Sequence, residues 1–206
     1  MRKLVLAGGA VAILGLSLGL WYTTGPGAGG DIFADCRSTR IAGGSGALGG
    51  PFTLTDQTGR EVTEAQVFEE PALLYFGYTF CPDVCPLDVA RNADAVDRLS
   101  EAGYEVTPVF ISLDPKRDTP EVLTEFAAAM HPDMKALTGT TEQVDAAAKA
   151  WRVYYNVPES DDPYYLVDHT TLTYLVLPGH GFAEIFRRDA TPEAIAETAA
   201  CFIDAA

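Results

Sequence analysis

Positive charge is scarce in this sequence. Its 206 residues include 14 Lys and Arg against 29 Asp and Glu, which gives a formal net charge of -15 at pH 7. Nucleic acid and anionic lipid surfaces would repel such a chain, so we expect neither as a partner. The charge suits attraction to cations or to a basic patch on another protein, although solubility alone is the simpler explanation.

Only one stretch is long and apolar enough to span a membrane. Two basic residues precede an uncharged run, residues 4–22, that ends in Trp21 and Tyr22. A helix of this length, rising about 1.5 Å per residue, just crosses roughly 30 Å of hydrocarbon. The basic residues indicate a cytoplasmic N-terminus, and the aromatic pair suits the membrane interface. We predict a single transmembrane anchor at residues 1–22 in the inner membrane, with the following domain in the periplasm; a cleaved signal peptide is the alternative.

The composition changes twice after this run. Residues 23–50 are rich in Gly, Ala and Ser and predict a flexible tether, interrupted by Cys36. From Pro51 onward the composition is that of a globular domain, so we place one domain at residues 51–206. We find no internal repeat in the sequence.

Segments with strand and helix character alternate along this domain. Short apolar runs predict strands, while helical spacing and threonines at cap positions predict helices. The expected strands are a hairpin over 52–62 and single strands over 72–76, 106–113, 164–167, 172–177 and 182–186. The expected helices are one over 87–99, one that begins at 120, one over 141–151, and one from 192 to the C-terminus. This order indicates an α/β sandwich with a mixed central sheet and an N-terminal hairpin.

Two of the four cysteines lie at the corner between the strand over 72–76 and the helix over 87–99. Pro86 suits the first helical position because it needs no hydrogen-bond partner there. Cys85 is then expected at or near the N-cap, where the helix dipole favours a thiolate. Cys81 lies one turn of chain away, and the pair is compatible with a structural disulfide, a redox dithiol or a metal site. A thioredoxin-type motif has a spacer one residue shorter.

The sequence has only three histidines. His131 follows an expected helix and is interpreted as a C-terminal capping residue, and His180 lies in a Gly-containing turn. His169 differs, because it interrupts two apolar strand runs, where a polar group needs a partner. It is either a hydrogen-bonded structural residue or a third ligand at the cysteine corner.

Three motifs resemble the signatures of the Sco (SenC/PrrC) family. They are Phe80-Cys81-Pro82-Asp83-Val84-Cys85-Pro86, then Ser112-Leu113-Asp114-Pro115-Lys116-Arg117-Asp118-Thr119-Pro120, and Val167-Asp168-His169-Thr170. The resemblance runs from about Pro51 to the C-terminus. It implies a thioredoxin-like, membrane-anchored copper protein that takes part in assembling the dinuclear copper centre of cytochrome c oxidase.

Carried over residue by residue, the family's metal ligands fall on Cys81, Cys85 and His169. Cuprous copper is soft and accepts two thiolates, and an imidazole completes a site that also holds the cupric ion. A structural zinc site usually has four protein ligands, which close the coordination shell. The segment from Asp114 to Pro120 matches a family motif that we interpret as a structured turn ending in a helix cap.

The leading hypothesis is a copper metallochaperone, not an enzyme. Its expected partners are the copper-binding subunit of cytochrome c oxidase, other periplasmic copper chaperones, and the membrane through the N-terminal helix. One alternative is a thiol–disulfide oxidoreductase that reduces the cysteines of the oxidase copper site. Another is a redox or copper sensor.

Cys36 and Cys201 lie outside the family pattern. In an oxidising compartment, the two cysteines that the site does not use form one further pair, so we expect a disulfide between them. A buried free thiol is the alternative for Cys201.

Overall fold

The computed structural model describes residues 31–37 and 48–206. The predicted anchor at residues 1–22 lies outside this part, as does most of the predicted tether. Within the described ranges, no helix has the length and apolar character needed to cross a membrane. The chain divides into two units, residues 1–35 and residues 36–206, and the fold described below is that of the second unit.

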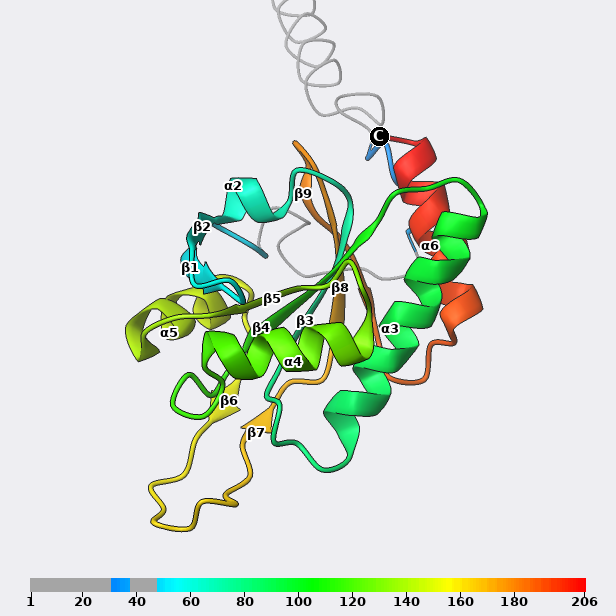
Figure 1. The fold of residues 1–206 in the computed structure, drawn as a ribbon. Helices are drawn as coiled ribbons and strands as arrows, with labels where there is room; N and C mark the ends of the chain where they lie inside the picture. Colours follow the sequence, from blue (N-terminus) through cyan, green and yellow to red (C-terminus); the bar gives the residue numbers. More distant parts are fainter. Residues whose placement is uncertain (1–30, 38–47) are drawn as a thin grey trace, which may run out of the picture. The chain divides into compact units, whose positions relative to one another are not determined.

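A seven-stranded mixed sheet forms the centre of this unit, with the strand order β2-β1-β5-β4-β3-β8-β9 (Figure 1). The strands are β1 (Thr53–Asp56), β2 (Glu61–Thr63), β3 (Ala72–Gly77), β4 (Thr107–Ser112), β5 (Lys135–Thr138), β8 (Thr173–Leu177) and β9 (Gly181–Phe186). The central strands β3, β4 and β5 are parallel, and the outer ones pair antiparallel. The predicted mixed sheet and N-terminal hairpin are therefore confirmed.

Threonine caps begin three of the helices. The helices are α2 (Glu64–Val67), α3 (Val84–Glu101), α4 (Pro120–Met130), α5 (Thr141–Ala150) and α6 (Pro192–Asp204). The side chains of Thr119, Thr140 and Thr191 each accept a backbone N–H of the first turn, as the sequence predicts. Helix α3 begins three residues earlier than expected, because Asp83 is its N-cap.

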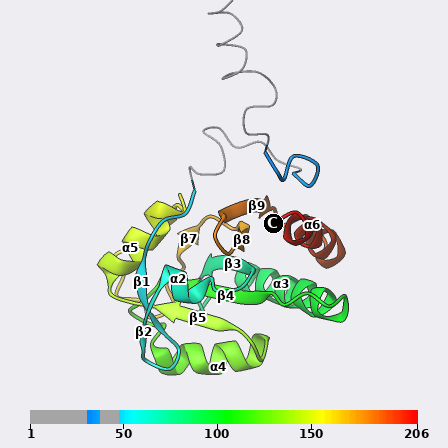
Figure 2. The same ribbon diagram turned by 90° about the horizontal axis from the view of Figure 1, so that it is seen from above.

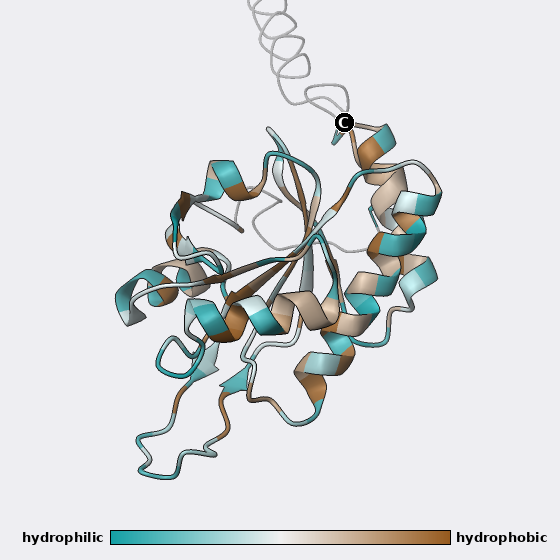
Figure 3. Cartoon of the chain, in the orientation of Figure 1, coloured by the Kyte–Doolittle hydropathy of each residue, from teal (hydrophilic) through white to brown (hydrophobic). Residues whose placement is uncertain are grey.

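Helices α3 and α4 cover one face of the sheet, and α5 lies on the other face (Figure 2). Successive residues of β3 point to opposite faces, so Leu74 and Phe76 pack with Trp151 after α5, while Tyr75 packs beneath α3. Helix α6 runs beside α3. Figure 3 shows the apolar strands enclosed between helices whose outer sides carry hydrophilic residues.

Two sequence expectations are corrected. The predicted strand over 164–167 is a loop, because none of the described strands pairs with it. Its burial still alternates as in a strand: Tyr165 and Val167 are buried, and Tyr164 and Leu166 are exposed. The strands of this region are β6 (Tyr155–Asn156) and β7 (Asp168–His169), which form a separate antiparallel ribbon. Strand β5 was not expected, since a four-residue run is too short to show a period.

The C-terminal end of β3 leads into the loop before α3. Strand β3 lies between β4 and β8 in the sheet. The connection from β3 to β4 runs through α3 on one face of the sheet, and the connection from β5 to β8 runs through α5 on the other face. In open α/β sheets, ligands commonly bind outside the carboxyl ends of parallel strands, as β3 and β4 are here. Figure 1 shows the start of α3 and the β6–β7 ribbon at this same end of the molecule.

Candidate functional site

Cys81 and Cys85 are free thiols at the start of α3. Cys85 is the second residue of the helix and has no exposed surface, while Cys81 in the preceding loop is 8% exposed. The backbone N–H of Cys85 donates to Cys81 Sγ at 3.3 Å. Both sulfurs belong to the apolar cluster between the sheet and helices α3 and α4.

Gly77 makes the close packing of Cys85 possible. A Cβ atom at this position would lie 3.2 Å from Cys85 Sγ and 2.9 Å from the ring of Tyr75. The absence of a side chain at the end of β3 therefore lets the sulfur sit directly over the strand.

The two thiols have opposite electrostatic environments. Burial raises the pKa of the Cys85 thiol, and the neighbouring Cys81 raises it further. Burial also acts to raise the pKa of Cys81, but hydrogen bonds from the backbone of Asp83 and Cys85 outweigh it and lower that pKa. The expectation of a thiolate at Cys85 is thus wrong: full burial overrides its position in the first helical turn, and Cys81 is the thiolate-forming member.

His169 comes to the cysteine corner from the β6–β7 ribbon. Its Nε2 lies 3.3 Å from Cys85 Sγ, across 84 residues of sequence, and its Nδ1 lies 2.9 Å from the carbonyl oxygen of Thr170. A carbonyl oxygen only accepts, so Nδ1 carries the proton and the Nε2 lone pair faces the sulfur. Burial lowers the pKa of His169, which favours the neutral imidazole. A ring oriented this way is typical of metal-ligating histidines.

Two tyrosines complete the walls of the site, and no sequence pattern marks either of them as a site residue. The rings of Tyr75 and Tyr78 meet the imidazole of His169 edge to face, with centroids 6.2 and 5.9 Å away. The hydroxyl of Tyr75 donates to the buried carboxylate of Asp88 at 3.0 Å. Tyr75 belongs to an apolar strand run, so only the fold reveals its contact with the site.

The structure thus brings together all three candidate ligands, in two contacts that share Cys85. They do not form a closed cage: within the described ranges, no three His, Cys, Asp or Glu side chains are already arranged around one metal position. The chemistry of the donor set, two sulfurs and one imidazole, fits a soft metal.

The comparisons with known proteins decide the family. Residues 42–204 match the SCO1/SenC family. The chain belongs to the SCO1/SenC family. Protein SenC of Rhodobacter capsulatus is 55% identical over 175 residues, which is 85% of this chain and 79% of SenC. The human mitochondrial SCO1 homolog is 42% identical over 146 residues, and the match covers 69% of this chain and 48% of that protein.

Solved SCO1/SenC structures share the fold. Arabidopsis thaliana ScoI with copper bound is 37% identical, with a TM-score of 0.72 over 77% of this chain and 99% of ScoI. Yeast Sco1 with copper bound is 35% identical, with a TM-score of 0.73 over 77% of this chain and 89% of that structure. The predicted family and thioredoxin-like α/β sandwich are confirmed.

The SCO1/SenC motif at residues 112–120 holds the loop that precedes Cys81 through the carboxylate of Asp118. Asp118 is fully buried, and its carboxylate accepts from the backbone N–H of Thr79 at 3.0 Å and from the Thr79 hydroxyl at 2.6 Å. It also accepts from the hydroxyl of Ser112 at 2.5 Å. The expected turn ending at the Thr119 cap is confirmed.

The other two histidines stay away from this site. His131 is the C-cap of α4, as expected, and its Nε2 lies 3.3 Å from Asp97. His180 is exposed in the turn between β8 and β9.

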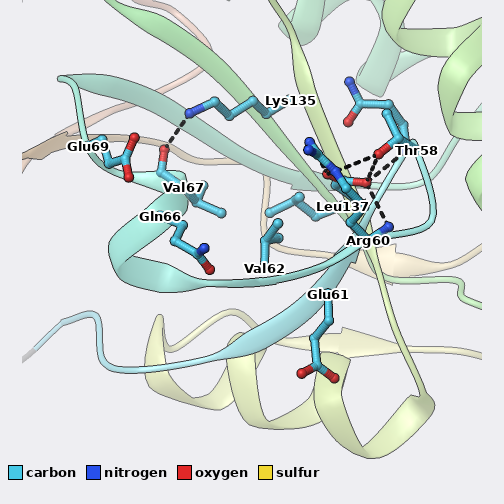
Figure 4. Close-up of a pocket in the computed structure, with 11 residues that line it drawn as sticks. Thr58, Arg60, Glu61, Val62, Gln66, Val67, Glu69, Lys135 and Leu137 are labelled. Atoms are coloured by element: carbon cyan, nitrogen blue, oxygen red, sulfur yellow. Dashed lines mark hydrogen bonds and ion pairs between the residues drawn. The ribbon is translucent and has the colours of Figure 1, made fainter.

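A cavity of about 410 Å³ lies elsewhere, beside β1, β2 and β5 (Figure 4). Its cations are engaged, since Arg60 pairs with Asp56 at 3.0 Å and Lys135 donates to the carbonyl of Val67 at 3.1 Å. It contributes no residue to the cysteine corner.

Proposed function

We propose that this SCO1/SenC protein binds copper through Cys81, Cys85 and His169 and delivers it to the copper-binding subunit of cytochrome c oxidase. The observation that carries the proposal is the orientation of His169, whose unprotonated Nε2 faces Cys85 Sγ while Nδ1 is held by a carbonyl. This is how a protein prepares an imidazole as a metal ligand.

Copper is the metal that the donor set and the relatives support. Two thiolates satisfy the cuprous ion, and the imidazole extends the site to the cupric ion. Related proteins from Arabidopsis and yeast were solved with copper bound. Three protein ligands leave the metal accessible, as delivery requires, whereas structural zinc prefers four ligands in a closed shell.

Delivery to a protein is supported by the surface around the site. Of the exposed large apolar side chains, four lie on the segments that carry the three ligands: Phe80, Leu87, Tyr164 and Leu166. Exposed apolar side chains on segments that lead to a site offer surface that a protein partner can cover. BsSco, which is 26% identical, is described as a member of the Sco family of cytochrome c oxidase assembly proteins.

We place the domain in the periplasm, held to the inner membrane by the run at residues 4–22. Washing membranes with carbonate should leave the full-length protein in the membrane fraction with its N-terminus intact. Recovery of a soluble form that starts near residue 25 would contradict the anchor.

Anaerobic titration of the reduced protein with cuprous and cupric copper tests the ligand set. We expect one copper per chain, and no tight binding after Cys81→Ser or Cys85→Ser. His169→Ala should weaken cupric binding more than cuprous binding. His180→Ala is the matched control, because this histidine lies in the β8–β9 turn, and it should change neither affinity. Unchanged copper stoichiometry in the Cys81→Ser/Cys85→Ser protein would overturn the assignment.

The second candidate is a thiol–disulfide oxidoreductase acting on the oxidase cysteines. The pKa of Cys81, lowered by backbone hydrogen bonds, beside the buried thiol of Cys85 favours it, because a reductant needs one attacking thiolate and one resolving thiol. Two electrons and two protons would pass to the partner's disulfide, leaving a Cys81–Cys85 disulfide. This activity does not need His169, so a His169→Ala protein that still supports oxidase assembly would favour the reductase.

A further inference from the structure

A single cation connects the two halves of the candidate site. The guanidinium of Arg117 is 11% exposed and lies 3.6 Å from the ring centroid of Tyr165. It also lies 4.8 Å from the centroid of Phe80 and 5.7 Å from that of Tyr78. Phe80 and Tyr78 belong to the loop that leads to Cys81, while Tyr165 belongs to the segment that leads to His169. One side chain therefore contacts both ligand-bearing segments.

Polar contacts hold the guanidinium in this position. Arg117 Nε donates to Asp114 Oδ2 at 2.5 Å, and Nη1 donates to the carbonyl oxygen of Pro163 at 3.1 Å. The other carboxylate oxygen of Asp114 accepts from the hydroxyl of Tyr165 at 2.8 Å. Asp114 is itself buried. Arg117 and Asp114 thus bind the segment 163–165 at its backbone, its ring and its hydroxyl.

Strand pairing gives the histidine segment little support, although Val167 is buried in the apolar cluster and the backbone N–H of Thr170 donates to the carbonyl oxygen of Tyr154 at 2.9 Å. Strand β7, which contains His169, has two residues and pairs only with the two-residue β6 among the described strands. The loop before it exposes Tyr164 and Leu166 at 80% and 58%. The contacts of Tyr165 with Asp114 and Arg117 therefore add to those of Val167 and Thr170 in fixing this segment.

We propose that Arg117 is a positioning residue that sets where His169 lies relative to Cys81 and Cys85. This inference has two readouts: copper affinity, which rests on the proposed function, and the NMR signals of His169 without copper, which do not. A lysine cannot replace the arginine, because a planar guanidinium stacks flat on a ring while its N–H groups donate in a fixed fork. An ammonium also donates, but it is a compact point charge with no flat face and no fixed donor geometry. Loosening this contact should release the imidazole while leaving the two thiols, which Asp118 and α3 hold, in place.

The test compares Arg117→Lys with Arg98→Lys in the full-length reduced protein. Arg98 is an exposed partner of Asp94 and Glu193, between α3 and α6, so the control makes the same substitution away from the site. Arg117→Lys should weaken cupric binding by about tenfold or more, as outer contacts of a metal ligand do. Cuprous binding, which the thiols satisfy, should change by less than about threefold.

A double variant separates positioning from general stability. If Arg117 acts through His169, Arg117→Lys should add nothing to the cupric defect of His169→Ala. Equal losses for both copper ions, or losses that add fully in the double variant, would overturn the positioning role. No change in either affinity would do the same.

A metal-free readout keeps the inference independent of the copper assignment. In nitrogen-15 NMR spectra of the reduced protein without copper, His169 should appear as the Nδ1–H tautomer. Arg117→Lys should shift its ring signals and mix the tautomers, and Arg98→Lys should not. If the wild-type protein binds no copper yet this difference appears, the proposed function fails and the positioning role stands. Unchanged His169 signals in Arg117→Lys would refute the positioning role directly.

Discussion

The disulfide between Cys36 and Cys201 should contribute measurably to stability. Its Cα atoms are 5.7 Å apart, and it closes a loop across 165 positions of the chain. The neighbouring Arg37 lies over the ring of Phe202 at 5.5 Å and donates to the carbonyl of Ala183 at 2.6 Å. The perturbation is the double substitution Cys36→Ser/Cys201→Ser, which removes the covalent bond and leaves these weaker contacts.

The magnitude follows from loop closure. A cross-link across about 165 residues lowers the entropy of the unfolded chain by an amount worth roughly 5 kcal/mol at 25 °C. Holding Cys36 and Arg37 in place costs about 1–2 kcal/mol of backbone entropy for each residue, which offsets part of this gain. We therefore expect the free energy of unfolding to fall by about 1–3 kcal/mol in the double variant.

Urea unfolding of the oxidised and substituted proteins measures this change. The midpoint should fall in Cys36→Ser/Cys201→Ser, while the copper stoichiometry of the reduced site stays at the wild-type value. The matched control is Cys81→Ser/Cys85→Ser, which should lose copper and keep the disulfide. Mild reduction followed by alkylation and peptide mapping should label Cys81 and Cys85 only. An unchanged midpoint, or alkylated Cys36 in the unreduced protein, would refute the reasoning.

Three further predictions follow from single residues. Gly77→Ala should destabilise the fold by about 1–3 kcal/mol through overpacking, and it should impair copper binding because the new Cβ would lie 3.2 Å from Cys85 Sγ; wild-type copper affinity would contradict this. As the pH rises, alkylation of Cys81 should accelerate at a lower pH than alkylation of Cys85, because the pKa of Cys81 is lowered and the pKa of Cys85 is raised. Mass spectrometry of samples quenched across a pH series measures both alkylation rates. Equal pH profiles for the two cysteines would disprove this difference in pKa. Arg152→Gly should stabilise the protein by about 1 kcal/mol in thermal unfolding, since Arg152 has a φ of 52° that glycine adopts without strain; a lower midpoint would show that the arginine makes a stabilising contact.

The positions of the main elements were readable from the sequence, because local patterns record which face of each segment is buried. Hydrophobic runs located β3, β4, β8 and β9, and the Thr-Pro pairs located the starts of α4 and α6. The same patterns failed for β5, which is too short, and for residues 164–167, whose alternating burial arises in a loop. The spacing of Cys81 and Cys85 and the family resemblance identified the candidate ligands, and cysteine counting identified the partner of Cys36.

Only the tertiary structure decided how these residues act. The pKa of each thiol depends on burial and on the N–H groups around it, so Cys81 and Cys85 differ although both lie at one corner. The contact between His169 and Cys85 joins positions 84 residues apart, and the tautomer of the imidazole depends on a carbonyl beside it. The position of Arg117 between the two segments that carry the candidate ligands is likewise a property of packing. Local sequence records burial and periodicity, but these contacts arise only when distant segments pack together.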